Sequence, residues 1–199
     1  MVIRQRTSGK GGRGARQRIL DAAAELFYRE GINATGVERL AAESSVSKRT
    51  LYQHFPSKAA VVEAYLRSIE QRVGNPIQSG VPVTDQTPRE RLLALFEVPG
   101  AGGSPTRGCP FHNAAVEAAG SMPNIQQIVL ANKRNFIDAL TELAKQAGAA
   151  DPHSLATQLA VLYEGAAALT TSMAESWPWA RAHAAAETLI DQALPWPRR

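Results

Sequence analysis

The segment from Ser47 to Tyr52 carries the side chains best suited to contact a polyanion. Its polar members are hydroxyls, cations and a phenol: Ser47, Lys48, Arg49, Thr50 and Tyr52. Such groups bind phosphate oxygens and base edges, and a guanidinium can donate to two guanine acceptors at once, which makes Arg49 the best base-reading candidate. Leu51 and Phe55 fall on the opposite face of a helix, and we assign both to the core. The pattern predicts a short amphipathic helix whose polar face meets DNA.

No other set of residues has the spacing that catalysis or metal binding requires. The chain contains no Ser/His/Asp arrangement, no phosphate-cradling glycine motif and no carboxylate pair at useful spacing. Cys109 and His112 could share a helical face, but two ligands are too few for a closed metal site, and His153 and His183 are far along the chain. We therefore expect no enzymatic activity, no cofactor and no metal.

Cys109 is the only cysteine among 199 residues, so the chain cannot form an intrachain disulfide. A cytoplasmic location is expected, because reducing compartments suit such chains and neither a run of 18 apolar residues nor a secretory signal is present. The favoured role of Cys109 is that of a small buried residue. The alternative is a thiol that senses oxidants or electrophiles, because a helix N-terminus can activate it.

The positive charge is concentrated at one end of the chain. Residues 1–73 contain 13 Lys and Arg against 7 Asp and Glu, whereas residues 74–199 contain 9 against 11. A cationic end on a mildly acidic body indicates a polyanionic partner. Arg4 and Arg6 belong to a basic, glycine-containing arm at residues 1–12, which either lies in a flanking minor groove or is simply disordered.

Four helices are predicted behind this arm. The first begins near residue 13 and ends at Gly31, a C-cap glycine. Thr35 and Glu38, three residues apart, form a capping box that opens the second helix. Ser44-Ser45 is expected to end the second helix. The third helix is predicted between Ser47 and Pro56, and the fourth between Ser57 and Gly74.

The remaining two thirds of the chain are predicted to be helical as well. After a linker at residues 74–87, five helices are expected at residues 88–98, 110–119, 124–146, 152–176 and 178–193. Abundant alanine and scarce aromatic residues favour helices, and no strand alternation is visible. The fold class is therefore all-α, with a three-helix helix-turn-helix unit and its linking fourth helix at residues 13–73 and a second helical domain at residues 74–199.

The helix-turn-helix segment resembles the DNA-binding signature of the TetR family of transcriptional repressors over roughly residues 14–73. The matching motifs are Thr35-Gly36-Val37-(x)2-Leu40-Ala41 and Val46-Ser47-Lys48-Arg49-Thr50-Leu51-Tyr52-Gln53-His54-Phe55-Pro56-Ser57-Lys58. The resemblance implies a homodimer that binds a pseudo-palindromic operator on double-stranded DNA and is released by a small-molecule effector. An activator of the same family is the alternative. Ser45 departs from the pattern, because the family commonly has glycine there, and serine at positive φ should cost about 1 kcal/mol.

The resemblance also assigns roles to individual residues. Thr35, Tyr52, His54 and Lys58 would bind phosphates, whereas Lys48, Arg49 and Thr50 would face the floor of the groove. The second domain would bind the effector, with lining candidates Tyr65, Phe111, His112, Asn113, Glu117, Asn132, Phe136, Tyr163 and Trp177. The last two helices would dimerise through Leu155, Leu159, Leu162, Ala166, Leu169 and Met173 on one, and Ala182, Ala186, Leu189, Ile190 and Ala193 on the other.

A non-specific architectural DNA protein is the competing interpretation. It would use the basic arm and bind any sequence with similar affinity. The helix-turn-helix interpretation instead predicts a preference of roughly 10³-fold or more for one palindrome.

Overall fold

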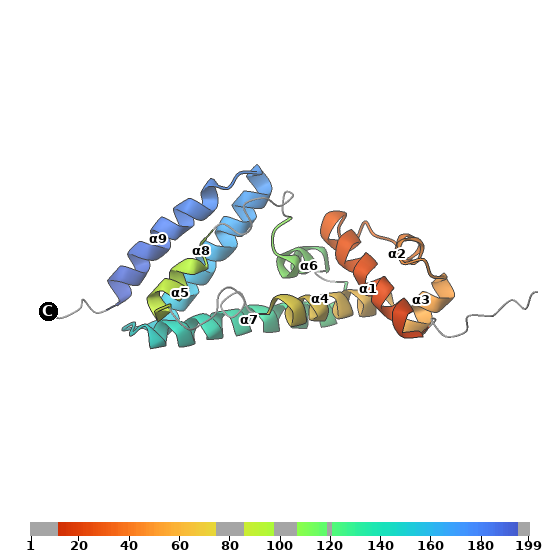
Figure 1. Ribbon diagram of the computed structural model, residues 1–199, viewed down its shortest axis with the longest axis horizontal. Helices are drawn as coiled ribbons and strands as arrows, with labels where there is room; N and C mark the ends of the chain where they lie inside the picture. Colours follow the sequence, from red (N-terminus) through yellow and green to blue (C-terminus); the bar gives the residue numbers. More distant parts are fainter. Residues whose placement is uncertain (1–11, 75–85, 98–106, 119–120, 195–199) are drawn as a thin grey trace, which may run out of the picture.

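The computed structural model describes residues 12–74, 86–97, 107–118 and 121–194, and its regular secondary structure in these ranges is helical, as predicted (Figure 1). The helices are α1 (Gly12–Arg29), α2 (Val37–Glu43), α3 (Lys48–His54), α4 (Lys58–Val73), α5 (Pro88–Ala94), α6 (Pro110–Ala118), α7 (Pro123–Gln146), α8 (Pro152–Met173) and α9 (Trp177–Ala193). Nearly all of the arm, most of the predicted linker and residues 98–106 lie outside the described residues. No described helix is long and apolar enough to cross a membrane.

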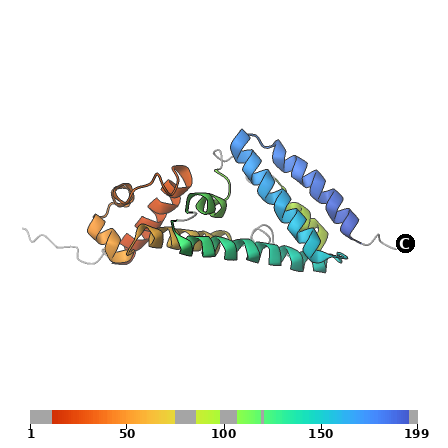
Figure 2. The same ribbon diagram turned by 180° about the vertical axis from the view of Figure 1, so that it is seen from behind.

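The helices form an elongated molecule. The first three, α1 to α3, lie at one end, whereas α5, α8 and α9 lie at the other (Figure 1). Between the two ends, α4 and α7 lie side by side along one edge in both the front and back views, and α6 fills the middle (Figure 2).

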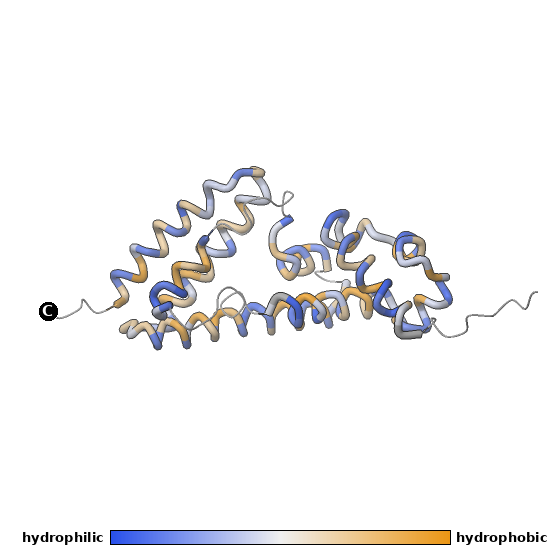
Figure 3. Tube along the Cα trace, viewed as in Figure 1, coloured by the Kyte–Doolittle hydropathy of each residue, from blue (hydrophilic) through white to orange (hydrophobic). Residues whose placement is uncertain are grey.

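Apolar residues at helical spacing hold the first end together. Ile19, Ala23 and Phe27 of α1 are buried, and they belong to one core cluster with Leu40 of α2 and Leu51 of α3, both 0% exposed. Figure 3 shows hydrophobic and hydrophilic positions alternating along these helices. Burying one leucine contributes about 1.5–3 kcal/mol, so this small cluster fixes the angles between α1, α2 and α3. The same cluster includes apolar residues of α4, α6 and α7, so the core is continuous across the middle of the molecule.

The predicted caps of α1, α3 and α4 are confirmed. Gly31 has a φ of 102° two residues after the end of α1. The Ser47 hydroxyl accepts a hydrogen bond from the Thr50 amide at 3.0 Å, and the Ser57 hydroxyl accepts one from the Ala60 amide at 3.1 Å. These local bonds explain why the limits of the helices could be predicted from single residues.

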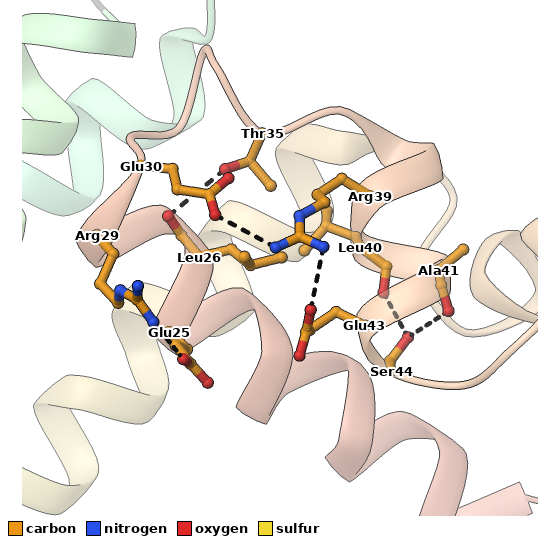
Figure 4. A network of polar contacts seen from close by, with 10 residues as sticks. All are labelled: Glu25, Leu26, Arg29, Glu30, Thr35, Arg39, Leu40, Ala41, Glu43 and Ser44. Atoms are coloured by element: carbon orange, nitrogen blue, oxygen red, sulfur yellow. Dashed lines mark hydrogen bonds and ion pairs between the residues drawn. The ribbon is translucent and has the colours of Figure 1, made fainter.

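The predicted capping box at Thr35 is wrong. The N-cap of α2 is Gly36, and no side chain caps this helix. Thr35 is instead 0% exposed, and its hydroxyl donates inward to the Gly31 carbonyl at 2.7 Å and, more weakly, to the Leu26 carbonyl (Figure 4). Thr35 closes the turn after α1, because its own amide also donates to the Gly31 carbonyl. Arg39 of α2 then forms an ion pair with Glu30, which directly follows α1, and a second one with Glu43 of its own helix. The pair with Glu30 holds α2 against the end of α1.

Two helices of the second half end earlier than predicted. The helix predicted over residues 88–98 ends at Ala94, because Phe96 and Glu97 donate to carbonyls three residues back and tighten the chain into a turn. The helix predicted to reach Ser176 ends at Met173, because Ala174 adopts a left-handed conformation with a φ of 54°. Nothing in the sequence marks these two endings, since neither carries a glycine.

Ser45 is predicted to limit the stability of the fold. Its φ of 51° lies in the left-handed region, which costs a residue with a Cβ about 1–2 kcal/mol. The Ser45→Gly variant should therefore gain about 0.5–1 kcal/mol in free energy of unfolding after the added entropy of the unfolded chain is subtracted. Urea denaturation would measure the change. As a control, Ala42→Gly inside α2 should lose about 0.5–1 kcal/mol, and a loss in Ser45→Gly would contradict the strain.

Candidate nucleic-acid interface

The outer face of α3 carries the predicted DNA-reading residues together. Ser47, Lys48, Arg49 and Tyr52 are exposed and Thr50 is half-buried, whereas Leu51 points into the core. The helix lies at the far end of the molecule from α9, so nothing in the described chain covers it (Figure 1). The hydroxyls of Ser47 and Thr50 lie 2.9 Å apart and bond to each other.

The two cations of this face, Lys48 and Arg49, differ in whether they form an ion pair with a described residue. Lys48 Nζ donates to Glu38 Oε1 of α2 at 2.5 Å, and this bond raises the pKa of Lys48 and lowers the pKa of Glu38. Both groups are exposed, so the pair is worth little stability but holds the lysine back toward α2. Arg49 makes no ion pair with any described residue. Arg49 is therefore the cation whose guanidinium is available to a base edge.

The remaining predicted phosphate contacts lie around the end of α3. Tyr52 is 46% exposed and His54 is half-buried in the last turn. Lys58 begins α4, and partial burial lowers the pKa of its ammonium, against the opposing effect of the Glu117 carboxylate. Thr35 does not join this group. Its hydroxyl is buried and already donates to Gly31, so the phosphate contact predicted for it is wrong.

Two arginines of α1 support α3, a role that sequence reasoning missed. The guanidinium of Arg16 lies over the ring of Phe55, 5.2 Å from its centroid, and Arg18 Nε donates to the Ser44 carbonyl at 3.0 Å. The second bond fastens the turn between α2 and α3. Their charge was visible in the sequence, but their partners are 26 to 39 positions away and leave no local signal.

The predicted effector-lining residues do not gather in one place. Tyr65 and Phe111 are buried in the first core cluster, whereas Phe136 packs against Tyr163 in the second cluster, with ring centroids 5.2 Å apart. His112 and Trp177 are exposed at the surface. The three polar candidates Asn113, Glu117 and Asn132 already bond to Arg107, Asn33 and Glu70, respectively.

A groove of about 480 Å³ lies between α4 and α7. None of the nine predicted lining residues borders it. Its walls are largely polar and comprise Glu63, Arg67, Glu70, Asn124, Gln127, Ile128, Ala131 and Asn135.

The segment before α6 bonds to α1, and the end of α6 bonds to the turn that follows α1. At the first end, Tyr28 Oη donates to the Gly108 carbonyl at 3.3 Å and accepts a bond from the Arg107 amide at 3.1 Å. At the second end, Glu117 Oε2 accepts from the Asn33 amide at 2.9 Å, and Asn33 Nδ2 donates to the Glu117 carbonyl at 2.8 Å. These bonds join the end of the molecule that α1, α2 and α3 form, called the reading end below, directly to the middle of the molecule.

Most of the predicted dimer stripe is buried within one chain. Six of its members lie in the second core cluster, where α8 and α9 pack on each other and on α7: Leu155, Leu159, Ala166, Ala182, Ala186 and Ile190. For these six the prediction is wrong. The predicted members Leu169 and Met173 of α8 are each 46% exposed. The exposed side of α8 also carries Val161, 73% exposed, together with Gly165 and Ala168. Trp177 and Ala184 are exposed on α9.

Comparison with known proteins shows where this arrangement recurs. Residues 19–65 match the sequence profile of the family described as bacterial regulatory proteins, tetR family. The solved structure of a protein described as a tetR transcriptional regulator from Streptomyces avermitilis is 32% identical, with a TM-score of 0.79, over 90% of this chain and 97% of that one.

Two curated relatives match over shorter stretches. The transcriptional activator FasR from Mycolicibacterium smegmatis is 40% identical over 85 residues, which are 41% of this chain and 37% of that protein. The transcriptional repressor KstR2 from Rhodococcus jostii is 44% identical over 61 residues, 31% of this chain and 29% of that protein. The chain thus spans well under half the length of either relative.

Proposed function

The chain belongs to the TetR family of bacterial transcriptional regulators, and we propose that it is a dimeric repressor that a small-molecule effector releases from a pseudo-palindromic operator. The observation that carries the proposal is the outer face of α3, where polar side chains are exposed on the side of the helix opposite the fully buried Leu51. A helix presented in this way fits the major groove with its first turns.

The side chains of this face divide into two roles. Arg49, free of ion pairs with described residues, would donate to a guanine, with Thr50 and Ser47 beside it on the groove floor. Tyr52, His54 and Lys58 would bind phosphates and set the position of the helix without reading sequence. Lys48 would have to leave Glu38 before it contacts DNA, so we assign it a secondary role.

The exposed stripe of α8 supports dimerisation. Gln158, Val161, Gly165, Ala168 and Ser172 recur at helical spacing on its outer side, and all five are exposed. Small residues allow two helices to approach closely, so this stripe and the exposed side of α9 suit a four-helix seam between two chains. A two-fold dimer would place its reading helices roughly 34–36 Å apart, one turn of the duplex.

Repression requires fewer protein-binding surfaces than activation does. A dimer seated on a promoter blocks access to it without touching the transcription machinery, whereas activation needs a further docking surface. The relatives include both a repressor and an activator, so the sign of regulation is a matter for a reporter assay. A promoter carrying the selected operator should become more active when this gene is deleted, and lower activity would favour an activator.

The side chains of α3 are expected to determine DNA selectivity. Selection from a random DNA pool should recover a two-fold-symmetric motif. Arg49→Ala should lose about 1–3 kcal/mol of discrimination at one base pair, because one bidentate contact disappears. Tyr52→Phe and Lys58→Ala should weaken binding to cognate and scrambled duplexes alike, because they remove phosphate contacts. Fluorescence anisotropy would compare the three variants, and equal effects on every sequence would contradict the division of roles.

The exposed stripe of α8 is expected to hold the two copies together. Nothing lies within 4 Å of a Cβ added at Gly165, so Gly165→Arg should leave the single chain folded. The bulky charge should nevertheless separate the two copies, and sedimentation should show a monomer with unchanged helical content. Gly165→Ala is the matched control, because it keeps the side chain small and the dimer intact. If Gly165→Arg also sediments as a dimer, this stripe is not the interface.

The hydrogen bonds between Glu117 and Asn33 are expected to hold the turn after α1 in place. Glu117→Ala should speed hydrogen exchange at the Asn33 amide and weaken operator binding about fivefold, because one net hydrogen bond is worth about 1 kcal/mol. Glu117→Gln keeps an acceptor oxygen and should have the smaller effect. Unchanged exchange in the alanine variant would mean that the bridge does not hold the reading end.

A further inference from the structure

Glu38 is an exposed carboxylate beside the helix that we assign to DNA reading. It belongs to the first turn of α2, and its side chain is 73% exposed. Lys48, the first residue of α3, donates a hydrogen bond from Nζ to Glu38 Oε1 at 2.5 Å. This contact joins the beginnings of the two helices of the helix-turn-helix, so it lies on the side that a duplex would approach.

The partner of Glu38 distinguishes it from the other carboxylates of the reading end. Glu30 and Glu43 both pair with Arg39 of α2, and the pair with Glu30 holds α2 against the end of α1 (Figure 4). Among the ion pairs of the described residues, the pair of Glu38 is the only one that includes a residue of α3. It therefore occupies a positive charge that the reading face would otherwise offer to DNA.

Both members of this pair are charged at neutral pH. The hydrogen bond from Lys48 lowers the pKa of Glu38, and a bond from its own backbone amide lowers it further. The same contact raises the pKa of Lys48. Because both side chains are more than half exposed, water screens their attraction. A DNA phosphate can therefore compete with the carboxylate for the ammonium.

We propose that Glu38 is an internal competitor of DNA phosphate for Lys48 and thereby limits the affinity of the protein for DNA that lacks the operator. The proposal rests on the proposed function, because it requires α3 to be the reading helix. In the free protein the carboxylate takes the place that a phosphate oxygen would take. A duplex gains the charge of Lys48 only after this ion pair has opened.

The competition acts most strongly on non-operator DNA. Binding to an arbitrary sequence derives nearly all of its free energy from cations that neutralise phosphates and release counterions. Such a complex has no preferred register, so a free Lys48 would find a phosphate within reach. On the operator, the base contact of Arg49 would fix the register, and Lys48 would gain only what that register offers. Holding Lys48 on Glu38 therefore raises the ratio of operator affinity to non-operator affinity.

A second electrostatic effect of Glu38 has a different signature. Once Lys48 has left, the unpaired carboxylate at the beginning of α2 would repel a nearby phosphate directly. This repulsion does not depend on Lys48, whereas competition does. The two effects can therefore be separated by removing the lysine and the carboxylate singly and together.

The test compares the full-length wild type with Glu38→Gln, which keeps the size of the side chain and removes its charge. Fluorescence anisotropy would measure binding to a scrambled duplex and to the selected operator at several salt concentrations. The scrambled duplex should bind Glu38→Gln about fivefold more tightly near 0.15 M salt, and log K should fall more steeply with log salt by about 0.9 for each Lys48 that reaches a phosphate. The operator should gain less.

Glu25→Gln is the matched control for net charge. Glu25 forms an exposed ion pair with Arg29 in the last turns of α1, and its substitution changes the charge of the chain by the same amount. In the scrambled duplex it should produce a smaller gain than Glu38→Gln. Lys48→Gln should flatten the salt dependence more in the Glu38→Gln background than in the wild type, because only there is the ammonium free of the carboxylate.

The outcomes distinguish this proposal from the proposed function. Equal gains in Glu38→Gln and Glu25→Gln, or a gain on the operator as large as that on the scrambled duplex, would overturn the competition. A gain that persists after Lys48→Gln would also overturn it and would leave direct repulsion as the cause. Failure of the wild type to prefer any palindrome would instead overturn the proposed function, whereas the comparison on the scrambled duplex needs no operator.

Discussion

A helix of seven residues does not persist on its own in water, so α3 depends on what lies behind it. Leu51 is fully buried. Phe55, the C-cap of the helix, is only 3% exposed, and its ring lies under the guanidinium of Arg16. Because side chains on a helix keep fixed angles to one another, burying Leu51 decides where Arg49 and Tyr52 point. The exposure of the reading face is a consequence of packing, and the strained Ser45 turn is the conformation that lets α3 reach that packing.

The parts of the fold that were predictable are those governed by neighbours along the chain. Ser47 and Ser57 cap α3 and α4 by accepting hydrogen bonds from amides three residues ahead, so the local sequence is enough to predict each cap. Thr35 shows the limit of this reasoning. A threonine three residues before a glutamate fits a capping box. The Thr35 hydroxyl donates to the Gly31 carbonyl instead, because the turn after α1 places the two groups within hydrogen-bonding distance. Sequence spacing gives the candidates for a bond, and the turn geometry selects among them.

Six residues of the predicted dimer stripe were misassigned for a different reason. Apolar residues surround most of α8, with Leu155 and Leu159 on one side and Val161 on another. Periodicity identifies a buried face when the opposite face is polar, but it cannot rank two apolar faces. Only the packing of α9 and α7 shows that the leucines face inward. The scattering of the effector candidates has a related origin, because a pocket is assembled from helices whose mutual positions no local pattern records.

The continuity of the core through α6 explains how a signal could travel without a hinge. Phe111 and Ala118 of α6 lie in the same cluster as Leu51, and the hydrogen bonds at Tyr28 and Glu117 fasten both ends of this region to the reading end. Close-packed interiors transmit displacement because they have little free volume to absorb it. Loss of one or two such bonds is worth about 1–3 kcal/mol, which is the size of typical coupling between sites and changes an affinity 5- to 150-fold. A displacement at the start of α6 that breaks these bonds would therefore suffice to weaken the operator binding that we propose.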